Sequence, residues 1–289
     1  MFRLMSAYIS NLVDVEIQQL ISKGWKDFPP EADCLRTAAR LRDSEISFPH
    51  QAYNLEIGNS EASGVWAKWR AKQILRVLKR FEFELLWEVG SGHGNVAIPL
   101  QSNGIAVIGI EPLLNGAKIT AGSGVRTYLG TLESLNLPSN SISVIGAFDV
   151  LEHLENPVVL LSEMYRVLEP GGLLLVSVPA HKWLFSDFDE SIGHHRRYSR
   201  KDLSQQLQQS GFLDRRFEFM FSIFVPPAYI LRKLPSLFGR SRNANSTTRS
   251  YRNQSKIIDA LEPTLMPFLY LERLLHLPFG LSLFGVCKK

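Results

Sequence analysis

The sequence predicts an α/β fold, in which one mostly parallel sheet is covered by helices on both faces. The first observation is the alternation of short apolar segments with longer amphipathic ones between residues 84 and 210. The second is a glycine-rich turn, Gly90-Ser-Gly-His-Gly94, directly after the first apolar segment of this series. The third is an acidic residue, Glu111, at the end of the next apolar segment, about 20 residues further on.

The expected elements follow in chain order. Apolar residues at helical spacing predict a first helix over residues 6–24, and a second helix is expected over 31–43. Ser199 is a favourable N-cap for a helix that runs to Ser210 and ends before Gly211. The other helices are expected over 64–80, 94–102, 115–123 and 156–168, and the first strands over 84–89, 105–110, 125–129, 142–148 and 173–178.

Two further strands, over 217–221 and 282–288, complete a sheet of seven strands. Roughly sixty residues separate them, far more than a hairpin loop needs, so an inserted helical segment is expected between them. This segment contains an apolar stretch, a polar linker over 239–255 and an amphipathic stretch over 257–277. The predicted organisation is a helical N-terminal extension, a core, the insertion and a last core strand, over residues 1–52, 53–221, 222–281 and 282–289.

The glycine-rich turn and its acidic neighbours indicate the class of ligand. The glycines let a ligand approach the backbone, and Glu111 on the neighbouring strand can accept both hydroxyls of a ribose. A dinucleotide-binding turn would have its third glycine where this chain has Asn95. Glu88, two residues before the turn, would repel a pyrophosphate but suits an ammonium group. These features favour S-adenosylmethionine, which carries a ribose, an ammonium group and a sulfonium but no phosphate.

On these residues the chain resembles the class I S-adenosylmethionine-dependent methyltransferases, whose first motif is acidic-x-Gly-x-Gly-x-Gly. The blocks Trp66-Ala-Lys-Trp-Arg70 and Gly193-His-His-Arg-Arg-Tyr198 are similar to a branch with type 11 and type 12 domains, found with polysaccharide and lipid biosynthesis. The resemblance implies a Rossmann-like, seven-stranded α/β sheet whose last strands are antiparallel. It also implies S-adenosylmethionine as the cofactor.

The turn and the resemblance together predict the residues that bind the cofactor. Arg70 is expected to hold the carboxylate of S-adenosylmethionine through a bidentate pair. Thr131 departs from the family pattern, because relatives carry an acidic residue there near the adenine; its hydroxyl or Glu133 is expected to substitute. The complete predicted set is Arg70, Glu88, Gly90, Ser91, Gly92, Gly94, Glu111, Pro112, Thr131, Leu132, Asp149 and Val150.

The block Asp149-Val-Leu-Glu-His153 ends the strand over 142–148, at an edge of the sheet where catalytic residues commonly lie. His153 and His194 are predicted to be catalytic, taking a proton from a hydroxyl nucleophile. The alternative is that Asp149 and His153 only shape the loop. The spacing is also similar to the Glu-x-x-Glu-His metal motif of quinone-biosynthesis O-methyltransferases. No metal ion is expected, because the same block is common in relatives without one.

The loop after the strand over 173–178 is expected to overhang the acceptor pocket. We predict that His181, Arg196, Arg197 and Tyr198, together with Trp66, contact an anionic or polyhydroxyl acceptor. The alternative is that an Asp–His–Arg network in this loop only fixes the loop.

Basic residues are concentrated near the C-terminus. Residues 213–289 hold twelve Lys and Arg against five Asp and Glu, a net charge of +7 in a chain of net charge +4, which leaves −3 for residues 1–212. The apolar stretch with Arg232 and Lys233 suits either a cap over the active site or a peripheral membrane contact through residues 221–233. Two distant cysteines and an N-terminus without a secretory pattern favour a cytoplasmic protein, free or at the inner face of a membrane.

The leading hypothesis is a methyltransferase for a small-molecule acceptor, directed at an oxygen of a sugar, a lipid-linked glycan, or an isoprenoid or phenolic compound. The basic C-terminal part also permits an RNA methyltransferase. The base-methylating signature Asn-Pro-Pro-Tyr is absent from the sequence, so RNA is disfavoured, and DNA is not expected as a partner. A non-catalytic partner protein that binds S-adenosylmethionine is the third hypothesis.

Overall fold

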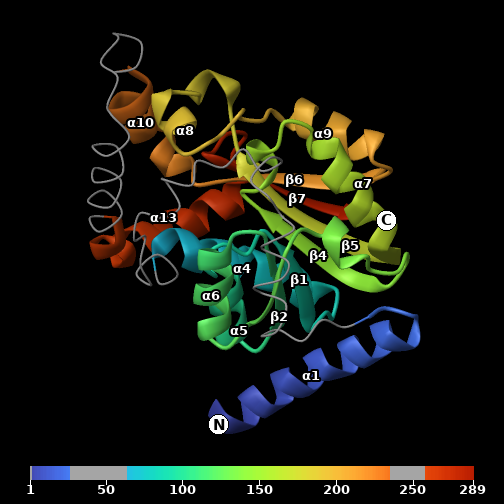
Figure 1. Ribbon diagram of the computed structural model, residues 1–289. Coiled ribbons are helices and arrows are strands. Elements are labelled where there is room, and N and C mark those ends of the chain that lie inside the picture. The colour runs from blue at the N-terminus through green and yellow to red at the C-terminus, as the bar shows by residue number, and fades with distance from the viewer. Residues whose placement is uncertain (1, 27–63, 235–257) are drawn as a thin grey trace.

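The computed structural model describes residues 2–26, 64–234 and 258–289 (Figure 1). A single seven-stranded sheet with strand order β3-β2-β1-β4-β5-β7-β6 forms its centre. The predicted α/β class and the antiparallel last strands are confirmed, because β7 is antiparallel to both β5 and β6. The helix expected over 31–43 and the linker expected over 239–255 lie outside the described residues.

The strands begin and end within one residue of the predicted bounds, with two larger differences. They are β1 (Leu85–Val89), β2 (Ala106–Glu111), β3 (Arg126–Leu129), β4 (Ile142–Phe148), β5 (Leu168–Pro179), β6 (Asp214–Met220) and β7 (Ser282–Lys288).

The first difference is at β5, which begins at Leu168 rather than at residue 173. Leu168 already pairs with Ile142, and a register shift takes the Pro170-Gly-Gly172 turn into the strand. The second difference is at β6, which begins at Asp214 rather than at residue 217. Its polar first residues pair with the end of β7, and they suit a strand at the edge of the sheet.

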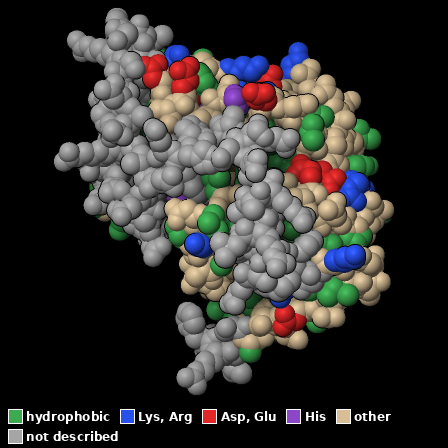
Figure 2. Space-filling view, in the orientation of Figure 1, with side chains coloured by type: hydrophobic (Ala, Val, Ile, Leu, Met, Phe, Trp, Pro, Cys, Tyr) green, Lys and Arg blue, Asp and Glu red, His purple; other side chains and the backbone are tan. Residues whose placement is uncertain are grey.

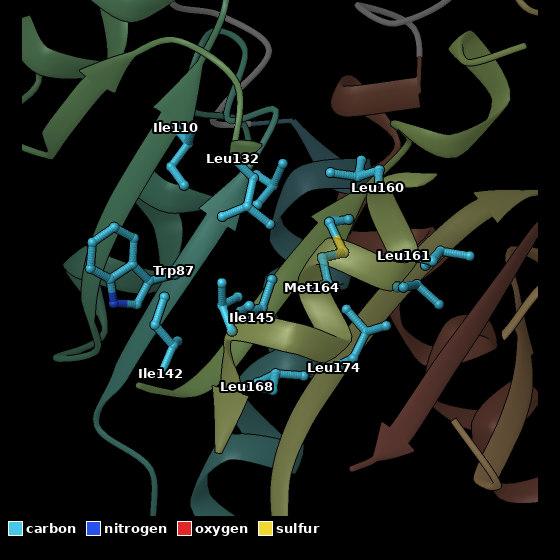
Figure 3. Close-up of a cluster of buried hydrophobic side chains, with 14 of the residues drawn as sticks. Trp87, Ile110, Leu132, Ile142, Ile145, Leu160, Leu161, Met164, Leu168 and Leu174 are labelled. Atoms are coloured by element: carbon cyan, nitrogen blue, oxygen red, sulfur yellow. The ribbon is translucent and has the colours of Figure 1, made fainter. Parts of the chain in front are cut away.

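Helices cover both faces of the sheet, because apolar residues alternate between the faces along each buried strand. One face packs against α4 (Val65–Arg80) and α5 (Ala97–Ser102), and the other against α1 (Phe2–Ser22), α7 (Pro157–Val167) and α9 (Arg200–Gln209). Figure 3 shows the core on this second face, in which Ile145 and Leu174 of the sheet lie near Met164 of α7, and Trp87 lies at one side of the same cluster. The remaining helix of the core, α6 (Leu114–Gly122), contacts β2 and β3.

The N-terminal helix α1 packs on the sheet through one apolar face, formed by Ile9, Val13, Ile17 and Leu20. The chain then brings Trp25 into the core, where its ring meets Trp87 and Tyr128 edge-on at 6.4 and 5.7 Å between ring centroids. Its indole N–H donates a hydrogen bond of 2.8 Å to the carbonyl of Leu135. The N-terminal extension is thus tied to the core by a buried aromatic side chain.

Replacing Trp25 with alanine is expected to lower the free energy of unfolding by about 3–5 kcal/mol, because it leaves a cavity and an unpaired carbonyl in the core. Denaturant unfolding of the two proteins measures the difference. Trp183→Ala is the control, since Trp183 is 51% exposed against 4% for Trp25. Equal effects of the two substitutions would contradict this docking of the extension.

The segment between β6 and β7 leaves the sheet and returns to it at one place, since Met220 pairs with Ser282. Its described elements are η4 (Ser222–Phe224), α10 (Val225–Ala228), the π-helical turn η5 (Tyr229–Lys233) and α13 (Glu262–Leu275). The buried carboxylate of Glu272 accepts a hydrogen bond of 2.6 Å from the backbone N–H of Ser222, which ties α13 to η4. In the described part of the chain, every helix is too short or too polar to span a bilayer.

Candidate active site

The glycine-rich turn leaves β1 at the edge of the sheet where the parallel strands end. Gly90, Gly92 and Gly94 all have positive φ angles, of 72°, 54° and 79°. A side chain at Gly90 would also clash, because its Cβ would lie 2.6 Å from Cγ2 of Val150. The N–H groups of Gly90 and Ser91 donate to the carbonyl of Ile110 at 2.8 and 3.1 Å, so the turn is bound to the end of β2.

Glu111 ends β2 beside this turn and is 3% exposed. One carboxylate oxygen accepts the N–H of Gly92 at 2.7 Å, and the other accepts the N–H of Leu113 at 2.8 Å. A carboxylate oxygen has two lone pairs and can accept more than one hydrogen bond. Thr120, which the sequence analysis missed, donates its hydroxyl to the carbonyl of Gly92 at 2.8 Å and braces the turn from α6.

Arg70 of α4 reaches the end of β4, where its Nη2 lies 2.6 Å from Oδ2 of Asp149. Asp149 has a positive φ of 56°, and its Oδ1 accepts the hydroxyl of Ser177 at 3.1 Å. Ser177 is a second residue that the sequence analysis missed, because it lies inside the long apolar β5. The ion pair holds the guanidinium of Arg70 at the end of β4, and its charge also acts on Glu88 in β1.

Glu88 lies inside β1 and is 2% exposed. Its Oε2 has no hydrogen-bond partner among the described residues. Burial raises the pKa of this carboxyl from 4.5 to about 8, although the charge of Arg70 opposes the shift and that of Glu111 adds to it. The side chain is therefore mostly protonated at pH 7, despite the charge of Arg70.

The residues predicted to lie near the adenine follow β2 and β3. Pro112 and Thr131 are half-buried, whereas Leu132 is completely buried within the hydrophobic core. Thr131 forms a tight turn with Ser134, exchanging hydrogen bonds of 3.0 and 3.3 Å between hydroxyl and backbone groups. Glu133, the alternative adenine contact, is exposed on the short turn η1 (Glu133–Leu135).

We call residues 180–198 the lid, since they join β5 to α9 at the same edge of the sheet. Its centre is Asp189 of α8 (Asp187–Ser191), which is completely buried. Its Oδ1 accepts Nε of Arg197 at 2.8 Å and lies 3.2 Å from Nδ1 of His194. Burial alone would raise the pKa of Asp189, but the contacts with His194 and Arg197 outweigh it and lower this pKa.

The structure gives Arg197 and Tyr198 internal contacts rather than exposed positions. Arg197 also donates to the carbonyl of Ala180 at 3.3 Å, and the hydroxyl of Tyr198 donates to the carbonyl of Leu151 at 3.1 Å. Arg196 is half-buried and donates to the carbonyl of Glu155 at 2.9 Å. The Asp–His–Arg network that the sequence allows as an alternative is therefore present in the lid.

Two other predicted acceptor residues lie against the segment between β6 and β7. The ring of Trp66 packs on Phe221 and Phe224, at 4.2 and 4.7 Å between ring centroids. His181 stacks on Phe219 at 5.2 Å, and its Nε2 accepts the N–H of Gly280 at 3.4 Å. Burial lowers the pKa of His181, so the neutral ring accepts this hydrogen bond readily.

His153 and His194 come together although 41 positions separate them in the chain. Their rings meet edge-to-face at 4.7 Å, and Nε2 of His194 lies 3.8 Å from the buried carboxylate of Glu152. Burial and the neighbouring His194 lower the pKa of His153 to about 4. Burial, and then Asp149, raise the pKa of Glu152 well above its usual value. At pH 7 the His153 ring is therefore neutral.

This strand order and the turn, ion pair and carboxylates at one edge of the sheet define a nucleotide-binding α/β fold of the methyltransferase type. The chain matches the family model of a methyltransferase domain over residues 63–215, more than half of its length. It therefore belongs to the methyltransferase domain family.

Curated relatives and a solved structure agree with this assignment. A protein of Mycolicibacterium smegmatis named "Probable S-adenosylmethionine-dependent methyltransferase" is 36% identical over 85 residues, which are 29% of this chain and 33% of that protein. A protein of Mycobacterium tuberculosis with the same description is 27% identical over 197 residues, 65% of this chain and 67% of that protein. The chain thus matches only a third of the length of the first of these relatives.

The fold is similar to that of phosphoethanolamine N-methyltransferase 2 of Haemonchus contortus in complex with S-adenosyl-L-methionine. The TM-score is 0.53 and the identity 19%, with 84% of this chain and 60% of that chain covered. The prediction of a class I S-adenosylmethionine-dependent methyltransferase is confirmed for family and fold. The polysaccharide and lipid branch stays a prediction.

Proposed function

We propose that this protein transfers a methyl group from S-adenosylmethionine to an oxygen of a small-molecule acceptor. The observation that carries the proposal is the set of groups around the glycine-rich turn. Glu111 accepts a hydrogen bond from the turn, and Glu88, whose Oε2 has no hydrogen-bond partner among the described residues, lies near Arg70. An ammonium ligand would add a second positive charge beside Glu88 and favour its ionised form. Nε of Arg70, which is buried without a hydrogen-bond partner in the described part of the chain, is available for a ligand carboxylate.

When bound, S-adenosylmethionine supplies an electrophilic methyl group on its sulfonium. In this proposal Glu111 holds the ribose, while Glu88 and Arg70 hold the amino-acid end, so the chain fixes the direction in which the methyl group faces. Asp149 keeps Arg70 in place through the 2.6 Å ion pair. In this proposal the lid keeps water away from the bound S-adenosylmethionine. Exclusion of water favours methyl transfer, because the positive charge of the sulfonium is lost in the reaction.

The acceptor side of the proposed site is formed by the lid. A hydroxyl acceptor loses its proton during the transfer, and His153 and His194 lie at the end of β4 where that proton would be taken up. Arg196, like Trp66 and His181, is a predicted acceptor residue that is neither fully buried nor part of the Asp189 network. A sugar, lipid-linked glycan or isoprenoid phenol would offer such a hydroxyl.

The proposal is tested in two steps with the full chain. Calorimetric titration with S-adenosylmethionine and S-adenosylhomocysteine is expected to show one site of micromolar affinity. A screen of hydroxyl acceptors with methyl-labelled S-adenosylmethionine is then expected to give a labelled product. Binding without transfer to any acceptor class would favour a non-catalytic partner protein. Salt-sensitive binding and labelling of RNA would favour the RNA hypothesis, although on the face in Figure 2 basic and acidic side chains are interspersed.

We also propose that an anionic membrane surface is the partner of the segment between β6 and β7. Within the apolar stretch, Phe221, Phe224 and Val225 are buried. The membrane would therefore be contacted by the exposed apolar residues of η5 and α13. These are Tyr229, Ile230, Leu231, Phe268, Leu271, Leu274 and Leu275. Flotation with anionic liposomes is expected to carry the wild type and to lose Ile230→Asp/Leu231→Asp. Equal flotation of the two proteins, or none for the wild type, would remove the membrane partner.

A further inference from the structure

Three side chains of metal-ligating type converge beneath the lid. Glu152 and His153 lie on the turn η2 (Leu151–His153) after β4, and His194 lies in the lid just after α8. One ligand atom of each lies within 4.8 Å of the other two. The sequence could show Glu152 and His153 as neighbours, but only the fold brings His194 to them.

Glu152 is the unexplained member of this cluster. It is completely buried, and neither carboxylate oxygen has a hydrogen-bond partner among the described residues. Burying an unpaired carboxyl group costs several kcal/mol, so such a group normally has a partner or a cation beside it. The nearest ion-pair contact is Nε2 of His194, at 3.8 Å.

Both histidine rings are oriented by an oxygen atom close to Nδ1. Nδ1 of His153 lies 3.1 Å from the carbonyl of Gly193, and Nδ1 of His194 lies 3.2 Å from Oδ1 of Asp189. An acceptor at Nδ1 holds the proton on that nitrogen and leaves the lone pair on Nε2. Carbonyl and carboxylate groups commonly orient metal-binding histidines in this way. Asp189 is itself fixed by Nε of Arg197 at 2.8 Å, so this outer layer is rigid.

We propose that Glu152, His153 and His194 bind one divalent transition-metal ion, with Zn²⁺ as the representative. Two imidazole nitrogens and one carboxylate suit Zn²⁺ or a similar borderline ion better than Mg²⁺ or Ca²⁺, which prefer oxygen ligands. Three protein ligands leave a coordination position for water or for an acceptor oxygen. The ion would also join the lid to the end of β4.

This site rests on the three side chains and not on methyl transfer. If the proposed function holds, a hydroxyl acceptor bound at the open position would have a lowered pKa and would release its proton to water. With the ion bound, His153 and His194 would act as ligands and would not themselves take up that proton. Metal binding is measured without S-adenosylmethionine or acceptor, so a failure of one proposal is distinguishable from a failure of the other.

The test is a calorimetric titration of the full chain, treated with chelator and dialysed, with ZnCl₂. One equivalent is expected to bind, and His194→Ala and Glu152→Gln are each expected to weaken binding by about tenfold or more. His195→Ala is the matched control, since His195 is the exposed neighbour of His194 and lies outside the cluster. This variant is expected to bind like the wild type.

A second readout protects the test against a misfolded variant. Co²⁺ added to the chelated wild type is expected to give visible absorption bands of a nitrogen- and oxygen-coordinated ion, and His194→Ala is expected to lose them. Saturating Zn²⁺ is expected to raise the melting temperature of the wild type and of His195→Ala but not of His194→Ala. No stoichiometric Zn²⁺ binding to the folded wild type, or equal loss in His195→Ala and His194→Ala, would overturn the proposal.

Discussion

Glu111→Ala is expected to lower the affinity for S-adenosylmethionine by about a hundredfold or more. Two hydrogen bonds from ribose hydroxyls to a carboxylate contribute on the order of 1.5–3 kcal/mol each, and the substitution removes both. It also removes the acceptor that holds the N–H of Gly92 at 2.7 Å, so the glycine-rich turn loses a brace. Calorimetric titration of wild type and variant measures the difference.

The control for this substitution is Glu190→Ala, which removes an exposed carboxylate on α8. It is expected to bind S-adenosylmethionine like the wild type. Circular dichroism of Glu111→Ala establishes that the variant is folded before its affinity is compared. A folded Glu111→Ala with wild-type affinity would show that the ribose is held elsewhere.

Glu88→Gln is expected to stabilise the free protein and at the same time to weaken S-adenosylmethionine binding. The folded-state pKa of Glu88 is raised from 4.5 to about 8. The stability that comes from its protonation is therefore fully present below pH 4.5 and lost progressively as the pH rises to about 8. A glutamine has no such loss, so at pH 7 the variant gains up to about 3 kcal/mol over the wild type.

Denaturant unfolding at several pH values measures this effect. The advantage of Glu88→Gln over the wild type is expected to grow between pH 5 and 8 and then to level off. In calorimetry at pH 7, binding of S-adenosylmethionine to the wild type is expected to release close to one proton, because the ligand ammonium favours the ionised carboxylate. The variant is expected to release none and to bind at least about tenfold more weakly. A stability difference that does not change with pH would contradict the assigned titration.

The sequence predicts the strands of the sheet well, because buried parallel strands are continuous apolar runs. Ile142–Phe148 was predicted with the bounds that β4 has. The predicted start of β5 at residue 173 was wrong, because Pro170-Gly-Gly172 resembles a turn in the sequence. Only the pairing with β4 shows that the strand passes through these residues. Periodicity likewise shows that α1 has an apolar face, but not that Trp25 enters the core behind it.

From the sequence, it was easier to predict which residues gather at the glycine-rich turn than which residues meet at the lid. Glu88, the glycines and Glu111 lie close in sequence, so their spacing alone indicates that they surround one turn. Side chains that meet across the fold give no such local signal. One example is the hydrogen bond from the hydroxyl of Ser177 to Asp149. Others are the hydrogen bond from the hydroxyl of Tyr198 to the carbonyl of Leu151 and the contact of His194 with Glu152.

The segment between β6 and β7 has consequences for how this protein could diversify. Its two ends meet at the Met220–Ser282 pair, and Glu272 ties it to Ser222. Lengthening a loop that closes on itself costs little free energy, because the closure entropy grows only with the logarithm of its length. The residues between the Met220–Ser282 pair can therefore change in evolution while the sheet and the glycine-rich turn keep their structure. Under the proposed function, the partner of this segment could change during evolution while the residues proposed to bind the methyl donor stay the same.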